Sequence, residues 1–379
     1  MKTRVITSID EIAASDWNRL AGPHNPFMLH EFLAALEHHH CVGERYGWLP
    51  QHVVVYDDNG RLIGATPLYI KDNSYGEFVF DWAWADAYYR SGRDYYPKLV
   101  STTPYTPVTG ERLLIDKEQD TARVTTALID AAIAHARHLS VSSLHWLFPP
   151  EHEAQRLQQH GLMLRIGYQF HWHNQGYNSF EDFLEQLSSR KRKQIRRERR
   201  HVTDANVELR VLSGHEISDE LWTVYHRHYA STFSKLGGYA TLSLEFFREL
   251  GRTMPDNIVL VMAYYQDKPV ASAFCLRGDD CLYGRHWGCE AEFNNLHFEA
   301  CYYQGIEYCI RHALTRFEPG AQGEHKISRG FLPSLTWSAH WIADATFRTA
   351  IGDFLVRETA GIQHYIEELN GHSPFRQSD

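Results

Sequence analysis

The sequence predicts an α/β (α+β) protein of two domains, in which mixed sheets are flanked by helices. The chain has 379 residues, which is more than one hydrophobic core usually organises. Stretches with helical periodicity alternate along it with apolar runs typical of strands. Two segments, 52–70 and 258–277, each resemble a β-hairpin with small residues in its second strand, and they lie more than half the chain apart. A duplicated α/β domain is the simplest explanation, and two unrelated hairpins are the alternative.

Composition and charge exclude several classes of protein. The chain is 43% hydrophobic and 22% charged, as in ordinary globular proteins. Its net charge of -9 argues against DNA binding by the whole surface, while leaving room for a local basic patch. No apolar run is long enough to span a membrane, and the N-terminus lacks the apolar core of a signal peptide. Six cysteines without a CxxC pair suggest reduced thiols, so we expect a cytoplasmic protein.

The 24 histidines do not form a recognisable metal-binding pattern. Consecutive histidines in "EHHHC" (37–41) point in different directions on a helix. His297 and Cys301 have a spacing that suits two ligands on one helical face, but no third ligand is evident. We therefore predict no bound metal.

The first half of the chain mixes both kinds of element. A helix is expected within 25–39, after which Asp-Asn-Gly marks the turn of the first hairpin. Residues 77–115 are aromatic and broken by prolines, so strands and loops are expected there. The remaining predicted elements are a helix at 119–138, a strand at 142–148, a helix at 151–160 and a strand at 162–174.

The second half is expected to begin with a helix at 179–202. A strand at 207–212 and helices near 217–234 and 243–252 precede a three-stranded meander at 258–288. A helix at 296–315 and two C-terminal helices within 344–370 complete the prediction. The predicted domains are 1–165 and 166–343, followed by the C-terminal helices in 344–379.

The predicted helix 179–202 has an unusual charge. Residues 190–200 hold eight lysines or arginines and one glutamate, a net +7 in a protein of net -9. Like charges at i, i+4 destabilise a helix, so an anionic partner is expected, although a solvated face without a partner is the alternative. Arginine favours bidentate phosphate contacts. The candidate phosphate-binding residues are Arg190, Arg192, Lys193, Arg196, Arg197 and Arg200.

The segment "FEPGAQGEHKISRGF" (317–331) combines charged groups with three glycines. Such a stretch could be a surface hairpin or part of an active site, in which charged groups act as bases or as donors to a developing negative charge. Glu324 and His325 are candidate bases, and Lys326 and Arg329 are candidate donors. If 324–329 is a strand, Glu324 and Lys326 share one face, and a simple ion pair between them is the alternative.

Several stretches resemble FemAB-type proteins, which consist of two tandem GNAT-like acyltransferase domains. The resemblance rests on "LSSRKRKQIRRERR", "YHRHYASTFSKLGGYATLSLEFF", "GRHWGCEAEFNNLHFEACYYQGIEYCI" and "FEPGAQGEHKISRGFLP", and on the aromatic segment from "FDWAWADAYYR" to "GERLL". It covers about residues 26 to 350 and is closest to a bacterial family of predicted N-acyltransferases labelled as peptidoglycan biosynthesis or recognition proteins.

The resemblance implies an acyl-donor site in the second domain. The donor would lie in a gap between strand 281–288 and a strand around 324–329, with Arg285, His286, Trp287 and Gly323 as substrate-binding residues. The Q/R-x-x-G-x-G/A loop of ordinary GNAT proteins is replaced by "CEAEFNNLHFEA", so acyl-CoA and aminoacyl-tRNA both stay open as donors. No tightly bound cofactor is expected.

The aromatic stretch 80–107 is the candidate acceptor region. Its rings and charges suit a polar acceptor such as a sugar, a peptide or an amine, and an aromatic core rimmed by charges is the alternative. In Fem-type enzymes the first domain contributes to the acceptor cleft, and the C-terminal helices pack back on that domain. The candidate acceptor residues are Asp81, Trp84, Asp86, Arg93 and Lys98.

The predicted function is transfer of an aminoacyl or acyl group to an amine, for which a small molecule or a cell-wall precursor is the expected acceptor. An acyl-CoA-dependent small-molecule N-acyltransferase is one alternative. A non-catalytic module that binds RNA or an anionic surface through residues 190–200 is another. Transfer RNA is the candidate macromolecular partner, and no oligomeric state is predicted.

Overall fold

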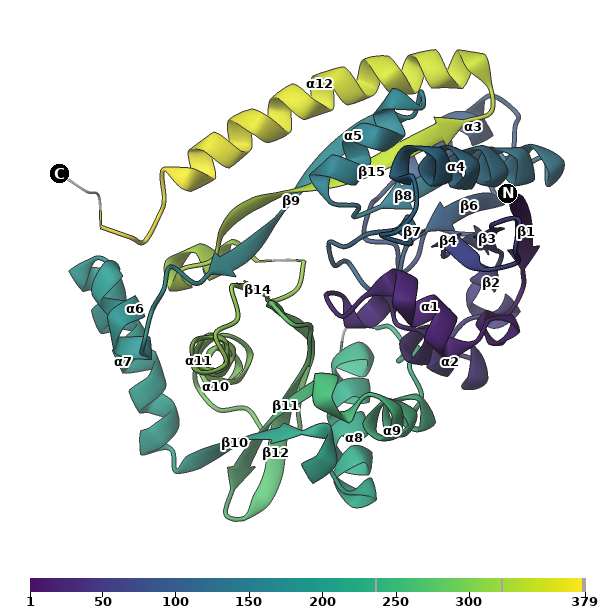
Figure 1. The fold of residues 1–379 in the computed structure, drawn as a ribbon. Helices are drawn as coiled ribbons and strands as arrows, with labels where there is room; N and C mark the ends of the chain where they lie inside the picture. Colours follow the sequence, from purple (N-terminus) through teal and green to yellow (C-terminus); the bar gives the residue numbers. More distant parts are fainter. Residues whose placement is uncertain (236, 322, 377–379) are drawn as a thin grey trace. The chain divides into compact units, whose positions relative to one another are not determined.

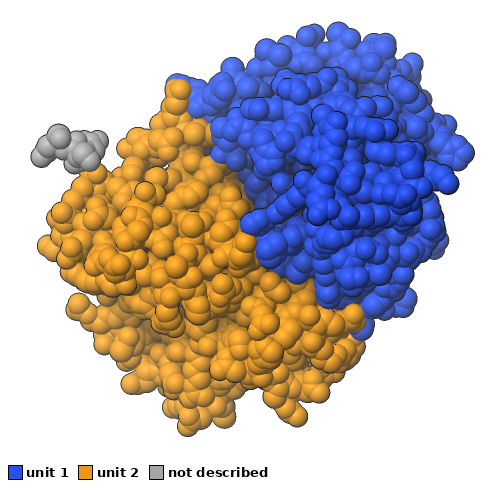
Figure 2. Space-filling view, viewed as in Figure 1, with its two compact units in different colours: residues 1–168, 335–365 blue, residues 169–334, 366–379 orange. Residues whose placement is uncertain are grey.

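The computed structural model describes residues 1–235, 237–321 and 323–376. It divides into two compact units, shown in different colours in Figure 2. Unit 1 comprises residues 1–168 and 335–365, and unit 2 comprises 169–334 and 366–379. The chain passes between the units within three elements, which are β9 (Met163–His173), β15 (Leu332–Ile342) and α12 (Ala345–Asn370).

Unit 1 contains two groups of paired strands (Figure 1). The first is antiparallel and has the order β1-β3-β4-β7, and the second has the order β15-β8-β6-β5-β2. β6 and β8 are parallel neighbours, and the chain between them includes β7 and a long helix. The strands are β1 (Lys2–Ile6), β2 (Leu49–Pro50), β3 (His52–Tyr56), β4 (Leu62–Thr66), β5 (Tyr69–Lys71), β6 (Lys98–Ser101), β7 (Leu114–Ile115) and β8 (Ser143–Leu147).

The core of unit 1 lies between its strands and α4 (Thr121–His138), which begins at the N-cap Asp120. Leu128 and Val124 of α4 are fully buried there. A Cβ on Gly64 of β4 would lie 2.6 Å from a Val124 methyl, so the close approach of α4 requires glycine at that position. The other helices are α1 (Ala14–Ala21), α2 (His30–His38), α3 (Trp82–Arg90), α5 (Glu151–Gln159) and α12.

Unit 2 contains strands in the order β10-β11-β12-β13-β14-β9. β10 to β13 form an antiparallel meander, whereas β13 and β14 are parallel. The strands are β10 (Val207–Ser213), β11 (Ile258–Tyr265), β12 (Lys268–Arg277), β13 (Cys281–Cys289) and β14 (Arg316–Glu318).

Helices pack closely on the strands of unit 2. A Cβ on Gly288 of β13 would lie 1.8 Å from the carbonyl oxygen of His228 in α8, so glycine permits contact between the two backbones. The buried His228 ring is hydrogen-bonded to Ser272 of β12 at 3.0 Å. The helices are α6 (Phe180–Gln186), α7 (Ser189–Asp204), α8 (Asp219–Lys235), α9 (Leu244–Thr253), α10 (Leu296–Phe298) and α11 (Gln304–Arg311), with a π-helical turn at Glu299–Tyr303.

Most of the predicted elements are confirmed. Both hairpins are present, as β3–β4 and β11–β12, and each unit also contains a parallel strand pair whose connection includes a helix. α4, α5, β8 and β9 lie within two residues of the predicted bounds. Within the described residues, no helix combines the length and the apolarity needed to cross a membrane.

Four predictions of secondary structure were wrong. The helix expected at 179–202 is interrupted, because Leu187 and Ser188 are extended and the Ser188 N–H donates to Pro374 O at 2.9 Å. Residues 324–329 form a 3₁₀ helix instead of a strand, and β14 (Arg316–Glu318) is the parallel neighbour of β13. The C-terminal region contains the single helix α12 instead of two. α3 was also missed, because the prolines around it suggested loops.

Candidate active site

A cleft of about 250 Å³ opens in unit 2 where β13 and β14 separate. The two parallel strands pair only from Cys281–Arg316 to Tyr283–Glu318. Beyond these pairs β13 continues to Cys289, whereas β14 ends at Glu318, and the cleft lies where the pairing stops. The walls of the cleft come from β12, β13, the helix after β13 and the 3₁₀ helix. The lining residues include Arg285, His286, Trp287, His297, Cys301, Tyr302, Gly320, His325 and Lys326.

A β-bulge shapes the β13 side of this cleft. Cys275 of β12 pairs with Gly284 and Phe274 pairs with His286, which makes Arg285 the inserted residue. Burial lowers the pKa of Arg285 to about 10, so the guanidinium keeps its charge at neutral pH. The bulge therefore places a cationic side chain at the point where the strands diverge.

Lys326 supplies a second cation from the opposite wall. Its side chain is 2% exposed, and Nζ donates to the carbonyl oxygen of Gly320 at 2.6 Å. Burial lowers the pKa of Lys326 to about 8. No carboxylate of the described residues forms an ion pair with this ammonium group, so a negative charge on a substrate would compensate it.

His325 and Tyr302 form a hydrogen-bonded pair at the same wall. The His325 Nε2 and the Tyr302 hydroxyl lie 2.8 Å apart. Burial, with the nearby charges of Arg329 and Lys326, lowers the pKa of His325, and burial lowers that of His297 to about 4. Burial also raises the pKa of the Tyr302 hydroxyl. The imidazoles of His325 and His297 are therefore neutral at pH 7. The hydrogen-bonded pair of His325 and Tyr302 can relay a proton.

The thiols in the cleft are not activated. Burial raises the pKa of Cys275 to about 12 and that of Cys301 well above its usual value. Nucleophilic catalysis by cysteine requires a thiolate, which neither environment favours. The cleft therefore offers no thiolate nucleophile from Cys275 or Cys301.

Three predicted residues of the 317–331 motif, Gly323, Glu324 and Arg329, are not lining residues of the cleft. Arg329 is buried, and its guanidinium donates to both carboxylate oxygens of Glu198 in α7, at 3.1 and 2.7 Å. Glu324 is exposed and is not a lining residue, so the ion pair with Lys326 considered above does not form. Gly323 has a φ of +111°, and a Cβ there would lie 2.4 Å from the His325 ring. Arg329 and Gly323 therefore position the 3₁₀ helix and His325.

The candidate acceptor residues of unit 1 are mostly engaged with one another or with neighbours. Asp81 and Lys98 form a buried ion pair at 2.5 Å, and Trp84 is buried against Ile342 and Leu355. Asp86 pairs with Arg90 at 2.8 Å, and Arg93 pairs with Asp344. These contacts lie within unit 1 and fix its local structure, so their role in binding an acceptor stays a prediction.

The basic helix α7 has one bonded side and one exposed side. Arg199 donates to Glu299 and Glu307, and Arg196 pairs with Glu181. The first turn of α7 holds no acidic residue, which leaves the positive end of the helix dipole next to several cations. In the described part of the chain, no carboxylate pairs with the other predicted phosphate-binding residues, Arg190, Arg192, Lys193, Arg197 and Arg200.

Reasoning from the sequence missed part of the cleft. Tyr302 was hidden among 21 tyrosines, and His297 and Cys301 were considered only as metal ligands. The sequence feature that could have indicated them was the four-residue spacing of His297 and Cys301 in a helical segment after β13. The π-helical turn at 299–303, a feature frequent at functional sites, has no simple sequence signature.

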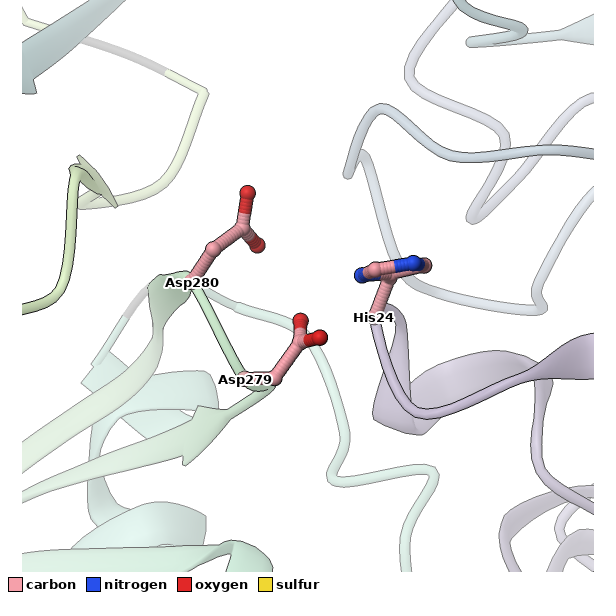
Figure 3. Close-up of side chains that lie close together, drawn as sticks. All are labelled: His24, Asp279 and Asp280. Atoms are coloured by element: carbon pink, nitrogen blue, oxygen red, sulfur yellow. The ribbon is translucent and has the colours of Figure 1, made fainter.

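We assign no metal to the acidic turn between β12 and β13. Figure 3 shows Asp279 and Asp280 of this turn in unit 2, together with His24, which follows α1 in unit 1. All three residues are exposed, and adjacent exposed carboxylates are common on protein surfaces without an ion.

Comparison with known proteins identifies the family. A family model for FemAB-like proteins, described as peptidoglycan biosynthesis/recognition, matches residues 8–377. The chain belongs to the FemAB-like family. No curated protein matches the sequence.

Solved structures share the fold of this FemAB-like chain. The C-terminal domain of a putative lysylphosphatidylglycerol synthetase from Agrobacterium fabrum has a TM-score of 0.54 at 8% identity, over 92% of this chain and 96% of that one. FemX has a TM-score of 0.54 at 12% identity, over 93% and 100%. A tandem GNAT protein from the clavulanic acid biosynthesis pathway has a TM-score of 0.46 at 12% identity, over 90% and 98%. The predicted α/β fold class, with mixed sheets flanked by helices, is confirmed by the arrangement of the two units and by the fold shared with FemX.

Proposed function

We propose that this FemAB-like protein is an N-acyltransferase whose acyl donor binds in the cleft between β13 and β14. The separation of these parallel strands around Lys326 and Arg285 is the observation that carries the proposal. A volume of about 250 Å³ suits an acyl group and its ester or thioester, with the rest of a large donor lying outside the cleft.

The residues of the cleft provide the groups that direct acyl transfer requires. The amine nitrogen attacks the acyl carbon, and the bond from this carbon to the sulfur or ribose oxygen of the donor breaks. The ammonium group of Lys326 stabilises the negative charge that develops on the carbonyl oxygen. The His325–Tyr302 pair takes the proton lost by the amine and delivers it to the leaving atom, so no cofactor is consumed.

The exposed cations of α7 are the proposed site for the phosphates of the donor. α7 contacts two elements that line the cleft, through Glu198 to the 3₁₀ helix and through Arg199 to the helix after β13. Its cations are therefore held in a fixed position relative to Lys326. Both aminoacyl-tRNA and acyl-CoA carry phosphates, so this surface suits either donor.

The family description supports an amine of a cell-wall precursor as the acceptor. A small-molecule amine is the alternative if acyl-CoA is the donor. Residues of unit 1 remain the predicted acceptor side on the resemblance to Fem-type enzymes.

Binding competition is the first test of the donor. Purified protein is titrated with bulk tRNA at near-physiological salt, with CoA as the competitor. Tight, salt-sensitive tRNA binding that is lost when Arg197 and Arg200 are reversed to glutamate supports aminoacyl transfer. CoA binding without tRNA binding supports the acyl-CoA alternative, and transfer products are then sought by mass spectrometry with an amine panel. Binding of neither donor contradicts the proposal.

A non-catalytic binding module is the second candidate, because the exposed side of α7 alone would bind RNA or an anionic surface. In that case Lys326→Met and His325→Ala leave the cellular function intact, whereas Arg197→Glu with Arg200→Glu abolishes it. The reverse pattern, with loss of function in Lys326→Met, contradicts this candidate. A genetic complementation assay with these variants separates the two.

A further inference from the structure

Unit 2 contains a second cavity that is larger than the donor cleft. Its volume is about 590 Å³, against about 250 Å³ for the cleft, and all of its lining residues belong to unit 2. They come from the end of β9, the loop that follows, α6, the chain around Gly330 and Leu332, and the C-terminal residues Phe375 and Arg376. A cavity of this size suits a whole small ligand.

The C-terminal segment forms one wall of this cavity and is bonded to the break between α6 and α7. The Ser188 N–H donates to Pro374 O at 2.9 Å. Two residues further along, the Arg376 N–H donates to Gln186 O at 2.9 Å. Phe375, which lies between these two bonds, is therefore held in place beside the end of α6.

Two aromatic rings of the lining rest on the same buried side chain. Tyr177 and Phe375 both pack against the fully buried Phe183 of α6, at centroid distances of 5.6 and 6.4 Å. A Cβ on Gly330 would lie 2.7 Å from the Phe183 ring, so glycine lets the chain pass close to these rings. The cavity thus has a preformed apolar part, against which the C–H face of a ring-shaped ligand can pack.

His171 adds a buried hydrogen-bond acceptor to the lining. The residue is 4% exposed, and its Nε2 donates to the side-chain oxygen of Gln169 at 3.2 Å. The carboxylate of Glu318, 3.9 Å from Nε2, favours the same tautomer. Burial lowers the pKa of His171 to about 3, so the ring is neutral and Nδ1 is an acceptor. Nδ1 has no partner among the described residues and is left for a donor on a ligand.

The other hydrogen-bonding side chains of the lining are mostly neutral. His173 lies two residues along β9 and shares the face of His171. Partial desolvation lowers the pKa of His173, so this imidazole is also neutral at pH 7. Gln175 and Gln186 contribute exposed amides. Imidazoles and amides both donate and accept, so the lining suits groups that do the same.

The charged groups of the lining balance one another. Asp182 and Arg376 are its charged residues; Asp182 accepts from a backbone N–H at 3.0 Å, and Arg376 donates to a backbone carbonyl at 3.4 Å. Next to His171, Arg316 and Glu318 pair with each other at 3.3 Å. The other described charged residues of α6 and α7 do not line the cavity. The described lining residues therefore carry no net charge.

We propose that this cavity binds a neutral carbohydrate. Sugar hydroxyls donate and accept, which matches the imidazoles and amides, and Nδ1 of His171 receives a hydroxyl proton. The C–H face of a pyranose ring packs on Tyr177 and Phe375. An ionic ligand would find no net charge in the lining to compensate its own. A peptide added as a strand would need a free strand edge, whereas β9 has strand neighbours on both sides.

The cavity shares a structural element with the donor cleft. The 3₁₀ helix contributes His325 and Lys326 to the cleft, and Gly330 at its end lines the cavity. If the transfer proposal holds, the cavity would bind the carbohydrate part of an acceptor beside the donor. Carbohydrate binding itself does not depend on transfer, because none of the cleft residues lines the cavity.

Isothermal titration calorimetry with the full-length protein tests the proposal. The probes are two neutral disaccharides, cellobiose and N,N′-diacetylchitobiose, of which the second adds acetamido groups. We expect at least one of them to bind, and to bind Gln175→Ala/Gln186→Ala at least about fivefold more weakly, because two hydrogen bonds are lost. Gln158→Ala/Gln159→Ala on α5 is the matched control, since both glutamines are exposed and neither lines the cavity.

A second variant tests the buried acceptor. His171→Phe keeps a ring at this position but removes Nδ1, so it should weaken disaccharide binding at least as much as the glutamine variant. Circular dichroism verifies that each variant is folded. If His171→Phe does not fold, the exposed glutamine pair still decides the outcome.

Several outcomes would overturn the proposal. Binding of neither disaccharide contradicts it, and so does equal affinity of the wild type and Gln175→Ala/Gln186→Ala. Binding of inorganic phosphate or of the dipeptide alanyl-alanine, without disaccharide binding, assigns the cavity to another class of ligand. Lys326→Met should bind the disaccharide as the wild type does, which separates this test from that of acyl transfer. Loss of disaccharide binding in Lys326→Met would place the sugar in the donor cleft instead.

Discussion

Two buried lysines in the two units have opposite surroundings. Lys98 of unit 1 is fully buried and bonded to Glu77 and Asp81, and although burial opposes it, these carboxylates raise the pKa of Lys98. Lys326 of unit 2 is also buried, but it donates to the neutral carbonyl of Gly320, and burial lowers the pKa of Lys326 to about 8. The protein supplies the counter-charge for Lys98, whereas no carboxylate of the described residues pairs with Lys326, which fits its proposed role at the donor site.

The parallel strand pairs of the two units also differ in whether the space beyond them is open or occupied. Beyond β13 and β14 the chain leaves a cleft. Beyond β6 and β8 the chain fills the space with residues 102–108 and with the fully buried Arg112, whose guanidinium donates to the Leu147, Gly110 and Val108 carbonyls. Next to the parallel strand pair, unit 2 thus has an open cleft, whereas unit 1 has polar groups of its own chain bonded to one another.

The largest expected effect is on stability, from Lys98→Met. The change leaves Glu77 and Asp81 buried without their cation, which should lower the free energy of unfolding by about 3–5 kcal/mol. Urea denaturation followed by circular dichroism measures it, with the exposed Lys117 changed to methionine as the control. A loss below about 1 kcal/mol would show that the ion pair does not hold unit 1 together.

Lys326→Met should reduce transfer while the protein stays folded. Removal of one charged donor to the oxyanion typically costs about 10²–10³ in kcat, so we expect at least a hundredfold loss with the donor that supports transfer. The measurement is the steady-state rate, with Lys268→Met as the exposed control in the same unit. Unchanged kcat in Lys326→Met would remove this lysine from the mechanism.

The same variant should be more stable than the wild type at pH 7. Because the folded pKa of Lys326 is lowered to about 8 from 10.5, its buried charge destabilises the fold below pH 8, and this cost disappears as pH rises from 8 toward 10.5. We expect Lys326→Met to gain roughly 2 kcal/mol at pH 7 and little at pH 10. Unfolding by urea at both pH values checks this, and a gain independent of pH would indicate improved packing instead.

The smallest effect is expected on the exposed side of α7. Arg197→Glu with Arg200→Glu should weaken binding of the phosphate-bearing donor about tenfold at low salt and reduce its salt dependence. Fluorescence anisotropy measures the affinity, and Arg252→Glu on α9 is the exposed control. Stability should not fall, since like charges along the helix are reduced. An equal loss of affinity in Arg252→Glu would show that the net charge of the protein, and not a specific contact with α7, determines donor binding.

The sequence alone determined the fold class, most of the elements and the position of a motif that lines part of the candidate cleft. Periodicity and turn residues depend on neighbours along the chain, so both hairpins, α4 and the meander could be predicted from local patterns. The motif 317–331 was found because clustered glycines and charges are unusual. His325 and Lys326 do line a cleft, together with Arg285, His286 and Trp287.

Tertiary structure decided which charged residues line that cleft and which form ion pairs inside the protein. Lys326 and Arg329 are three residues apart and alike in sequence, yet Arg329 is bonded to Glu198, which lies 131 positions away, whereas Lys326 borders the cleft. Asp81 and Lys98 were predicted to bind the acceptor, which stays a prediction, and folding places them in a buried ion pair with each other. The sequence gives the type of each charged side chain, but folding brings in its partner from distant positions of the chain. That partner determines whether the charge is neutralised inside the protein or can interact with a substrate.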